Sequence, residues 1–527
     1  MLFDSNLFVF LFLPLSLVAF QMLRAKGFDK ASRFWVIVAS FVFYGWWNPI
    51  YIFLLAGSIG FNYTIGVKLL GCRTIAMRRC TLAFGIAANT GLLAYFKYAN
   101  FFIDVLGIDV TSISIFQNII LPLAISFFTF QQIAYLVDLY RKETTETSLL
   151  NYCLFVSFFP QLIAGPIVHH KEMLPQFAKK KSPKVNWKDL AVGITIFSIG
   201  LFKKVVLADG IGVYADSGFA TADTGDGLGF VESWLTTIAF SMQIYFDFSG
   251  YSDMAIGLGR MFGIVLPLNF FSPYKAANII EFWHRWHITL SRFLRNYLYI
   301  PLGGSRQGTY RRDINIMITM LLGGLWHGAG WGFIIWGGVH GLFLVVNHRW
   351  QDMKRIRKTK KICKPNRQLY CRYLTFALVT LAWVFFRLDD QGDAIKMVMS
   401  MMLIDHLIQT VESMSNYFGL ATVHPSILLT SVTRGVIDES IFVWDAQLVV
   451  LYMATLTIAL FLPNTYQLMR SYTPAIASKQ FTNRIDDGFI LEWFPGRLFF
   501  VFVCALWALI YFASVRLPHA EFIYFQF

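Results

Sequence analysis

A single histidine, His327, lies in a glycine-rich apolar stretch, LLGGLWHGAGW (residues 321–331). A neutral imidazole can take a proton from a weak nucleophile such as a hydroxyl group, and it does so near physiological pH. An ionisable side chain at membrane depth is costly, and it therefore indicates a functional site. The alternative is that the ring donates to a backbone carbonyl group and only joins two helices.

More polar residues lie between residues 269 and 312. His284 and His287 are three residues apart, and this spacing predicts that they share one helix face. Four basic residues stand among aromatic ones, and they are Lys275, Arg285, Arg292 and Arg295. They predict either a cytoplasmic lip that binds an anionic donor such as a nucleotide phosphate, or an interfacial helix whose arginines reach lipid headgroups. We expect no metal, because the two histidines lack a further spaced ligand and the six cysteines show no ligand spacing.

The composition places these residues in a membrane protein. Of the 527 residues, 56% are hydrophobic and only 14% are charged, whereas an ordinary soluble domain has about 25% charged residues. The formal net charge of +14 could suggest a nucleic-acid partner. The basic residues lie in short loops between apolar spans, however, as is typical of cytoplasmic loops. We therefore expect no nucleic acid.

Ten apolar stretches are predicted to cross the membrane, because a crossing helix needs about 20 residues. These stretches are 7–23, 34–46, 51–67, 82–96, 119–139, 190–207, 230–247, 373–387, 441–462 and 494–515. The positions of the basic loops put both termini outside. The sequence therefore predicts one all-α polytopic membrane domain over residues 1–527, with about ten transmembrane helices.

Three further apolar segments do not fit simple crossings. Residues 150–168 and 252–268 predict re-entrant or broken helices, which are tolerated only inside protein or beside a wet cavity. Residues 314–347 have basic residues on both sides, and they predict a hairpin. Its first apolar stretch, 314–326, would span about 20 Å, less than a hydrocarbon core of about 30 Å. We therefore expect His327 near the apex of the hairpin, within the membrane.

The sequence resembles the membrane-bound O-acyltransferase family, in its alginate O-acetylation branch, over nearly the whole chain. The resemblance implies a ring of membrane helices with funnels from both faces, a catalytic histidine at His327 and a second recurrent polar position at His287. His284 stands where the family often has arginine, and Asn296 where it often has aspartate, so we expect no acid–base role at Asn296. The matching stretches are FYGWWNP (43–49), YFKYANFF (95–102), LPLAISFFTFQQIAYLVDLYR (121–141), FFPQLIAGPI (158–167), QIYFDFSGYSDMAIGLGRMFGI (243–264), EFWHRWHITLSRFLRNYLYIPLGG (281–304) and LLGGLWHGAGW.

The resemblance also implies a function. It implies an O-acetyltransferase of the bacterial inner membrane that uses cytoplasmic acetyl-CoA to O-acetylate an extracytoplasmic polysaccharide; alginate, cellulose and peptidoglycan are all compatible. The expected partners are membrane lipid, a periplasmic transferase resembling SGNH hydrolases and the polysaccharide secretion machinery. The alternative is a transporter that exports a polysaccharide or its precursor. It would also use broken helices, but the chain shows no inverted repeat.

The last six residues, FIYFQF, form an aromatic tail. Phe522, Tyr524 and Phe527 give the pattern F-x-Y-x-x-F, which resembles the end of the small membrane partner in the related D-alanylation system. The tyrosine is implicated there as an acyl carrier. Two interpretations follow for this chain. Either the tail folds back into the outer funnel and Tyr524 accepts acetyl beside His327, or its rings only anchor the chain end at the membrane interface.

Overall fold

The described part of the chain is built of helices. The computed structural model describes residues 1–107, 119–145, 147–178, 186–224, 227–356, 365–403, 446–484, 492–517 and 520–523. Within these ranges the strand-like pairing consists of one isolated bridge between Pro267 and Ile476. The prediction of an all-α protein is confirmed.

The first part of the chain contains eight helical elements, which pack largely as neighbours in pairs. They are η1 (Phe8–Phe12), α1 (Leu13–Ala25), α2 (Asp29–Gly45), α3 (Tyr51–Gly71), α4 (Ile75–Leu93), η2 (Ala94–Tyr98), α5 (Ala99–Leu106) and α6 (Ile125–Tyr140). α1 packs against α2, and α3 and α4 both pack against α6. The two π-helical elements, η1 and η2, interrupt otherwise regular helices.

The next part contains the broken segment predicted at residues 150–168. Its elements are α7 (Leu149–Ser157), α8 (Phe159–Leu162), α9 (His170–Ala178), α10 (Trp187–Phe202), η4 (Lys203–Ala208), α11 (Asp209–Asp223) and α12 (Phe230–Met261). Phe158 leaves the helical conformation between α7 and α8, and the chain is irregular again from residue 163 to residue 169. The break is therefore confirmed, and its buried position fits the rule that irregular backbone at such depth needs protein around it.

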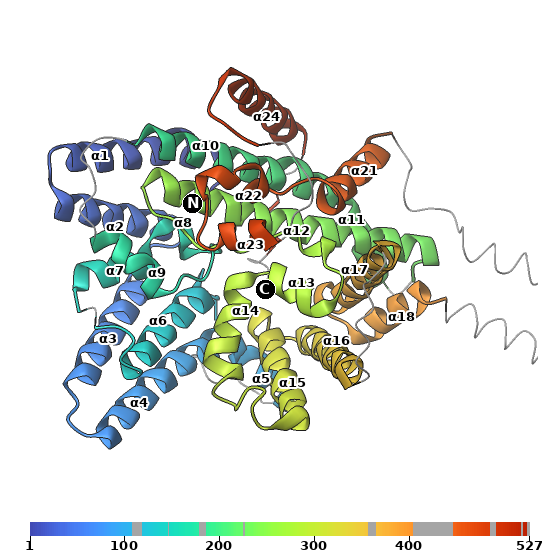
Figure 1. The fold of residues 1–527 in the computed structure, drawn as a ribbon, viewed down its shortest axis with the longest axis horizontal. Helices are drawn as coiled ribbons and strands as arrows, with labels where there is room; N and C mark the ends of the chain where they lie inside the picture. The colour runs from blue at the N-terminus through green and yellow to red at the C-terminus, as the bar shows by residue number, and fades with distance from the viewer. Residues whose placement is uncertain are drawn as a thin grey trace, which may run out of the picture.

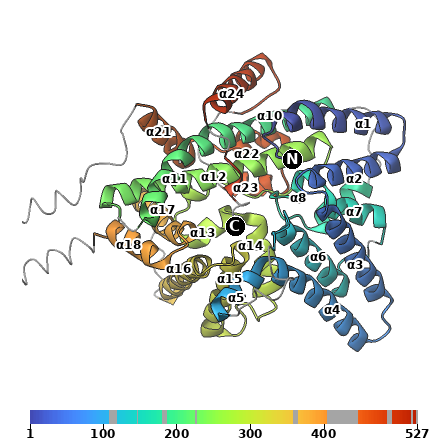
Figure 2. The same ribbon diagram turned by 180° about the vertical axis from the view of Figure 1, so that it is seen from behind.

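The remaining helices complete the periphery and the centre. They are η5 (Pro273–Lys275), α13 (Ile279–Arg285), α14 (Ile288–Leu294), η6 (Arg295–Tyr299), α15 (Gly308–His327), α16 (Trp331–Ile356), α17 (Pro365–Arg387), α18 (Gln391–Met401), α21 (Ala446–Leu460), α22 (Thr465–Leu468), η7 (Arg470–Tyr472), α23 (Ser478–Arg484) and α24 (Arg497–Arg516). Figures 1 and 2 show α13 and α14 near the middle, with α1–α4, α10–α12 and α16–α18 around them. α24 packs against α10 at the edge of the molecule (Figure 1).

Five stretches of the described helices are long and apolar enough to cross a membrane. They are Phe8–Ala25, Tyr51–Gly71, Trp187–Asp223, Arg367–Arg387 and Arg497–Arg516. They coincide with five of the ten predicted crossings. The chain is a multi-pass membrane protein, and the crossings predicted at the shorter or more polar helices remain predictions.

The prediction of a broken segment at residues 252–268 is wrong for its first ten residues. They belong to α12, which runs unbroken for 32 residues. A Cβ atom on Gly250 would lie 2.7 Å from the carbonyl oxygen of Gly200, and a Cβ on Gly200 would lie 2.6 Å from that of Gly250. These glycines therefore let the backbones of α10 and α12 approach closely, as small residues do between membrane helices. They mark a packing face rather than a break.

Two lysines of η4 form buried ion pairs with the same long helix. Lys203 Nζ lies 2.7 Å from Asp253 Oδ2, and Lys204 Nζ lies 3.0 Å from Asp247 Oδ1 and 2.6 Å from Asp209 Oδ1. Charges removed from water need such partners, because a lone buried charge is strongly destabilising. The pairs hold α12 in register against η4 and α11.

Candidate active site

The hairpin predicted around His327 is confirmed. His327 is the last residue of α15, and α16 begins four residues later, after Gly328–Gly330. α15 is longer than expected, however, because it begins at Gly308 and has 20 residues, or about 30 Å of helix. A helix of this length can cross the hydrocarbon core, so the length of α15 does not predict an apex at mid-membrane. Only its apolar part, residues 314–326, is short enough for that argument. The depth of His327 remains a prediction.

Glycines bring the two arms of the hairpin into backbone contact. A Cβ on Gly324 would lie 2.1 Å from the carbonyl oxygen of Phe333, and a Cβ on Gly337 would lie 2.3 Å from that of Met320. At the turn, a Cβ on Gly328 would lie 2.0 Å from the ring of Phe333. The glycines of this stretch therefore serve the packing of α15 against α16.

The C-terminal end of α15 is capped by a lysine from a distant part of the chain. Lys97 Nζ donates to the carbonyl oxygen of Trp326 at 2.6 Å and to that of His327 at 2.9 Å. The Tyr98 hydroxyl donates to the carbonyl oxygen of Leu325 at 2.9 Å. The last carbonyl groups of a helix lack intrahelical partners and carry partial negative charge, so a cation there is favourable. Both donors lie on η2, which thus orients the residue that precedes the turn.

Sequence reasoning did not single out Lys97. The available signal was a lysine within an apolar helix, which by itself indicates a polar partner or a functional position. Its stretch, YFKYANFF, was noted only as part of the family resemblance.

The imidazole of His327 is enclosed by aromatic rings. Its centroid lies 4.9 Å from Trp326, 5.1 Å from Trp336 and 5.3 Å from Phe386, all in edge-to-face arrangements. The residue is only 4% exposed. This apolar surround favours the neutral form of the ring, which is the form that accepts a proton.

His287 is also a neighbour of this tryptophan. The Trp326 ring is 6.2 Å from the His287 ring, so Trp326 is a common neighbour of both histidines. His287 is fully buried, and its Nδ1 lies 3.0 Å from Asn269 Oδ1. That oxygen also accepts from the backbone N–H and the hydroxyl of Thr289.

This hydrogen bonding defines the tautomer of His287. The backbone N–H of Thr289 can only donate, and it donates to this same Asn269 atom, which identifies the atom facing the histidine as the acceptor oxygen. Nδ1 of His287 therefore carries the proton, and Nε2 keeps its lone pair. Nε2 makes no hydrogen bond within the described residues. His287 thus has an acceptor nitrogen available to a bound hydroxyl group.

The prediction that His284 and His287 share one helix face is wrong. α13 ends at Arg285, Trp286 is extended, and His287 adopts a left-handed conformation with φ 40° before α14 begins. His284 is exposed whereas His287 is buried. The i, i+3 rule requires a continuous helix, and the break at residues 286 and 287 removes it.

The four predicted donor-binding residues have different environments. Lys275 is buried and donates to the carbonyl oxygen of Leu462 at 2.8 Å, and Arg285 is buried and pairs with Glu281. Arg292 is partly exposed, and it binds the Glu172 carboxylate through two nitrogens, with Nη2 at 2.8 Å from Oε2. Arg295 is exposed. Of the four, Arg292 and Arg295 are therefore the ones that reach solvent, and the Arg292 guanidinium is already paired with Glu172.

A cavity of about 670 Å³ reaches His327. Its lining includes Lys97 and Trp326 together with Met1 and Glu521 from the two ends of the chain. The residues after α2 and at the start of α6 also contribute to it. These ends and connections belong to segments predicted to lie outside, so we expect this cavity to open toward the outer side.

The chain end is directed into the protein as far as the structure describes it. Phe522 is buried with its ring centroid 5.7 Å from that of Phe248 and 4.8 Å from that of Tyr251. The backbone N–H of Ile523, also buried, donates to Asp247 Oδ2 at 2.9 Å. Tyr524 and Phe527 lie outside the described residues, so their predicted roles are not tested.

Comparisons with known proteins support the same region. The family model described as MBOAT, membrane-bound O-acyltransferase family, matches residues 90–383, which include Lys97, His287 and His327. The chain is 45% identical over 427 residues to the peptidoglycan O-acetyltransferase of Helicobacter pylori, covering 76% of this chain and 80% of the relative. It is 41% identical over 408 residues to a probable alginate O-acetylase, AlgI, of Pseudomonas aeruginosa, covering 76% and 75%. A teichoic acid D-alanyltransferase of Streptococcus thermophilus is 25% identical over 291 residues, covering 51% of this chain and 69% of the relative.

Replacing the capping lysine tests the construction of this site. Lys97→Met removes two hydrogen bonds from a charged donor, each contributing about 1.5–3 kcal/mol, and leaves two carbonyl groups of α15 without this partner. We expect the thermal unfolding transition of the purified protein in detergent to fall by several degrees. The matched variant Tyr98→Phe removes one neutral hydrogen bond and should lower the transition less. Equal transitions for Lys97→Met and the unmodified protein would contradict the capping role.

Proposed function

Because the chain belongs to the membrane-bound O-acyltransferase family, we propose that it transfers acetyl groups from cytoplasmic acetyl-CoA across the bacterial inner membrane, for O-acetylation of an extracytoplasmic polysaccharide. It is an acyltransferase, so the alternative of a polysaccharide exporter no longer has support. Two of the relatives are named for O-acetylation of peptidoglycan and of alginate, which favours acetyl as the acyl group. Acetyl-CoA is the proposed donor because its thioester is an activated form of that group.

One observation carries the proposal: His327 lies at the end of α15, within an aromatic enclosure, and lines a cavity of about 670 Å³. A hydroxyl nucleophile in this cavity could reach a buried, neutral imidazole. The proposed reaction forms a bond between the hydroxyl oxygen and the acetyl carbonyl carbon, and breaks the carbon–sulfur bond of the thioester. His327 accepts the hydroxyl proton and then returns it to the departing thiolate.

His287 serves as a positioning group in this proposal. Its Nε2 lone pair, directed by the hydrogen bond from Nδ1–H to Asn269, is suited to accept a hydrogen bond from the attacking hydroxyl. One histidine, His327, suffices as the base. The second histidine orients the nucleophile or a water molecule beside Trp326.

The donor is proposed to bind from the cytoplasmic side, near Arg292 and Arg295. These two side chains are accessible, and the phosphates of acetyl-CoA are strong hydrogen-bond acceptors for guanidinium groups. Lys275 and Arg285 support the same segment through internal contacts and are assigned no phosphate contact. The competing partner for the exposed arginines is the lipid headgroup.

The aromatic tail is proposed to carry the acetyl group outward. Glu521 lines the cavity that contains His327, Phe522 is held between aromatic rings, and the N–H of Ile523 is bound by Asp247. Tyr524 is the next residue. Its hydroxyl would attack the thioester, its proton would pass to His327, and the acetyl-tyrosine ester would then be consumed by a periplasmic transferase that esterifies the polymer. This relay would move acetyl across the membrane without moving CoA.

The first experiment concerns His327. Its replacement in His327→Ala should reduce the release of free CoA from labelled acetyl-CoA at least about a hundredfold, as expected for loss of a general base. His340→Gln, which alters another fully buried histidine of the same hairpin, is the matched control and should retain most of the activity. Near-normal turnover in a folded His327→Ala protein would refute the assignment.

The second experiment concerns the donor side. Charge reversal in Arg295→Glu should raise the KM for acetyl-CoA about tenfold with little change in kcat, because it repels the phosphates of the donor. Arg73→Glu reverses an exposed charge in the loop between α3 and α4 and is the control. An unchanged KM in Arg295→Glu would assign this arginine to lipid headgroups instead.

The third experiment removes only the hydroxyl group of the tail tyrosine. In Tyr524→Phe, polymer acetylation should fall to background, whereas the unmodified protein should yield an acetylated Tyr524 peptide by mass spectrometry. Tyr511→Phe, on the exposed face of α24, is the control and should acetylate normally. Normal acetylation by Tyr524→Phe would exclude the relay while leaving His327 as the base for an acceptor from another chain.

A further inference from the structure

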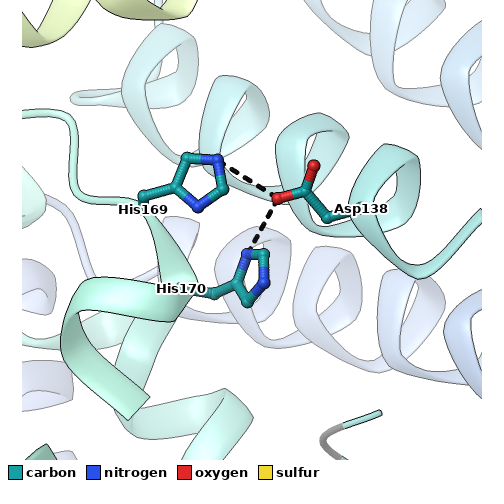
Figure 3. A group of neighbouring side chains, drawn as sticks. All are labelled: Asp138, His169 and His170. Carbon is teal, nitrogen blue, oxygen red and sulfur yellow. Dashed lines mark ion pairs between the residues drawn. The ribbon is translucent and has the colours of Figure 1, made fainter. Parts of the chain in front are cut away.

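A second polar cluster lies away from the His327 cavity, where α6 ends and α9 begins. Its members are Asp138, in the last turn of α6, and the adjacent residues His169 and His170. Figure 3 shows both imidazole rings directed at one oxygen of the Asp138 carboxylate. Arg141 directly follows α6 and Lys171 is the second residue of α9, and such basic residues place the cluster on the side predicted to be cytoplasmic.

The spacing of the three ligand atoms fits a metal ion. Asp138 Oδ2 lies 3.1 Å from His169 Nε2 and 3.3 Å from His170 Nδ1 (Figure 3). All three atoms lie within 4.8 Å of one another. Zinc binds imidazole nitrogen and carboxylate oxygen at about 2.0–2.1 Å, so two ligand atoms of a tetrahedral site are separated by about 3.3 Å. Both distances to the carboxylate oxygen are close to that edge length.

Tyr297 of η6 supplies a fourth oxygen at the same point. Its hydroxyl lies 3.1 Å from each carboxylate oxygen of Asp138 and also contacts His169 Nε2. The cluster thus draws its atoms from three separate segments, which is typical of a site that ties elements together.

The second observation is the state of His170. It is 2% exposed, its Nδ1 contacts only the Asp138 carboxylate, at 3.3 Å and without a hydrogen bond, and its Nε2 has no hydrogen-bond partner within the described residues. Buried polar side-chain atoms nearly always have a hydrogen-bond or ligand partner. Imidazole nitrogen is a common ligand of zinc, so a metal ion would supply the missing partner.

We propose that Asp138, His169 and His170 bind a zinc ion, with the Tyr297 oxygen in the fourth position. Two imidazoles and one carboxylate suit zinc, whereas magnesium and calcium prefer all-oxygen sites. A site whose positions are all filled by protein is structural rather than catalytic. The ion fastens α6, α9 and η6 to one another, next to the pair formed by Arg292 and Glu172. It thereby stabilises the proposed donor-binding side.

An opening to solvent lies beside the site. A cavity of about 450 Å³ is lined by His170, together with Glu143 and Lys171. A metal ion needs such an entry path. The Glu143 carboxylate, which is paired with Lys171, stands at its edge.

The test uses the full-length protein, purified in detergent without a polyhistidine tag. Elemental analysis should find about one zinc per chain, and His170→Gln should lower this value at least tenfold. His284→Gln, which removes an exposed histidine outside the cluster, should retain the zinc. Zinc retained equally by His170→Gln would overturn the assignment of the site.

A second measurement begins with the unmodified protein, so its main result does not depend on the folding of a variant. Dipicolinate treatment of the unmodified protein should lower its thermal unfolding transition, and added Zn²⁺ should restore it. Co²⁺ added to the stripped protein should give the visible absorption of a four-coordinate site, and Tyr297→Phe should alter that spectrum. Absence of zinc, with an unfolding transition that neither dipicolinate nor Zn²⁺ moves, would overturn the proposal and leave the cluster as a polar contact between helices.

Discussion

The two hydrogen bonds from Lys97 to the end of α15 are the contact on which the arrangement of the site depends. The last carbonyl groups of a helix need donors, and in an apolar environment water does not supply them. Lys97 supplies both donors from η2, more than two hundred residues earlier in the chain. The same contact holds the backbone of Trp326 and His327 at the end of α15. It therefore holds His327 at the start of the glycine turn, where the residue lines the cavity.

Close backbone packing makes that placement rigid. Glycines bring α15 against α16 and α10 against α12 at distances that a Cβ atom would not permit. Membrane helices gain little from hydrophobic association within lipid, so their contacts depend on such close packing and on polar pairs. The ion pairs of Lys203 and Lys204 supply the polar part along α12. The aromatic enclosure of His327 is thus held between elements with little freedom to shift.

The predicted topology assigns the cavity and the accessible arginines to different sides of the membrane. The cavity near His327 is lined by both chain ends, and the described part of the tail is bound inside by Phe248, Tyr251 and Asp247. The accessible arginines and the cluster of Asp138 with two histidines belong to segments predicted to be cytoplasmic. This predicted separation is what the proposed transfer of an acyl group from one side to the other requires.

The sequence by itself determined the all-α membrane class, the family, the hairpin at His327 and the break in residues 150–168. These follow from the composition, from the positions of glycine and proline and from the spacing of motifs, which are all local properties of the chain. Only the tertiary structure decided that α12 is continuous, because its glycines face α10 rather than interrupt the helix. It also separated His284 from His287, because the helix breaks between them. The spacing rule assumes a continuous helix, whereas His287 lies at the break and bonds to Asn269, a distant residue. The cap from Lys97 and the meeting of Asp138, His169, His170 and Tyr297 could not be predicted, since each joins segments far apart in the chain.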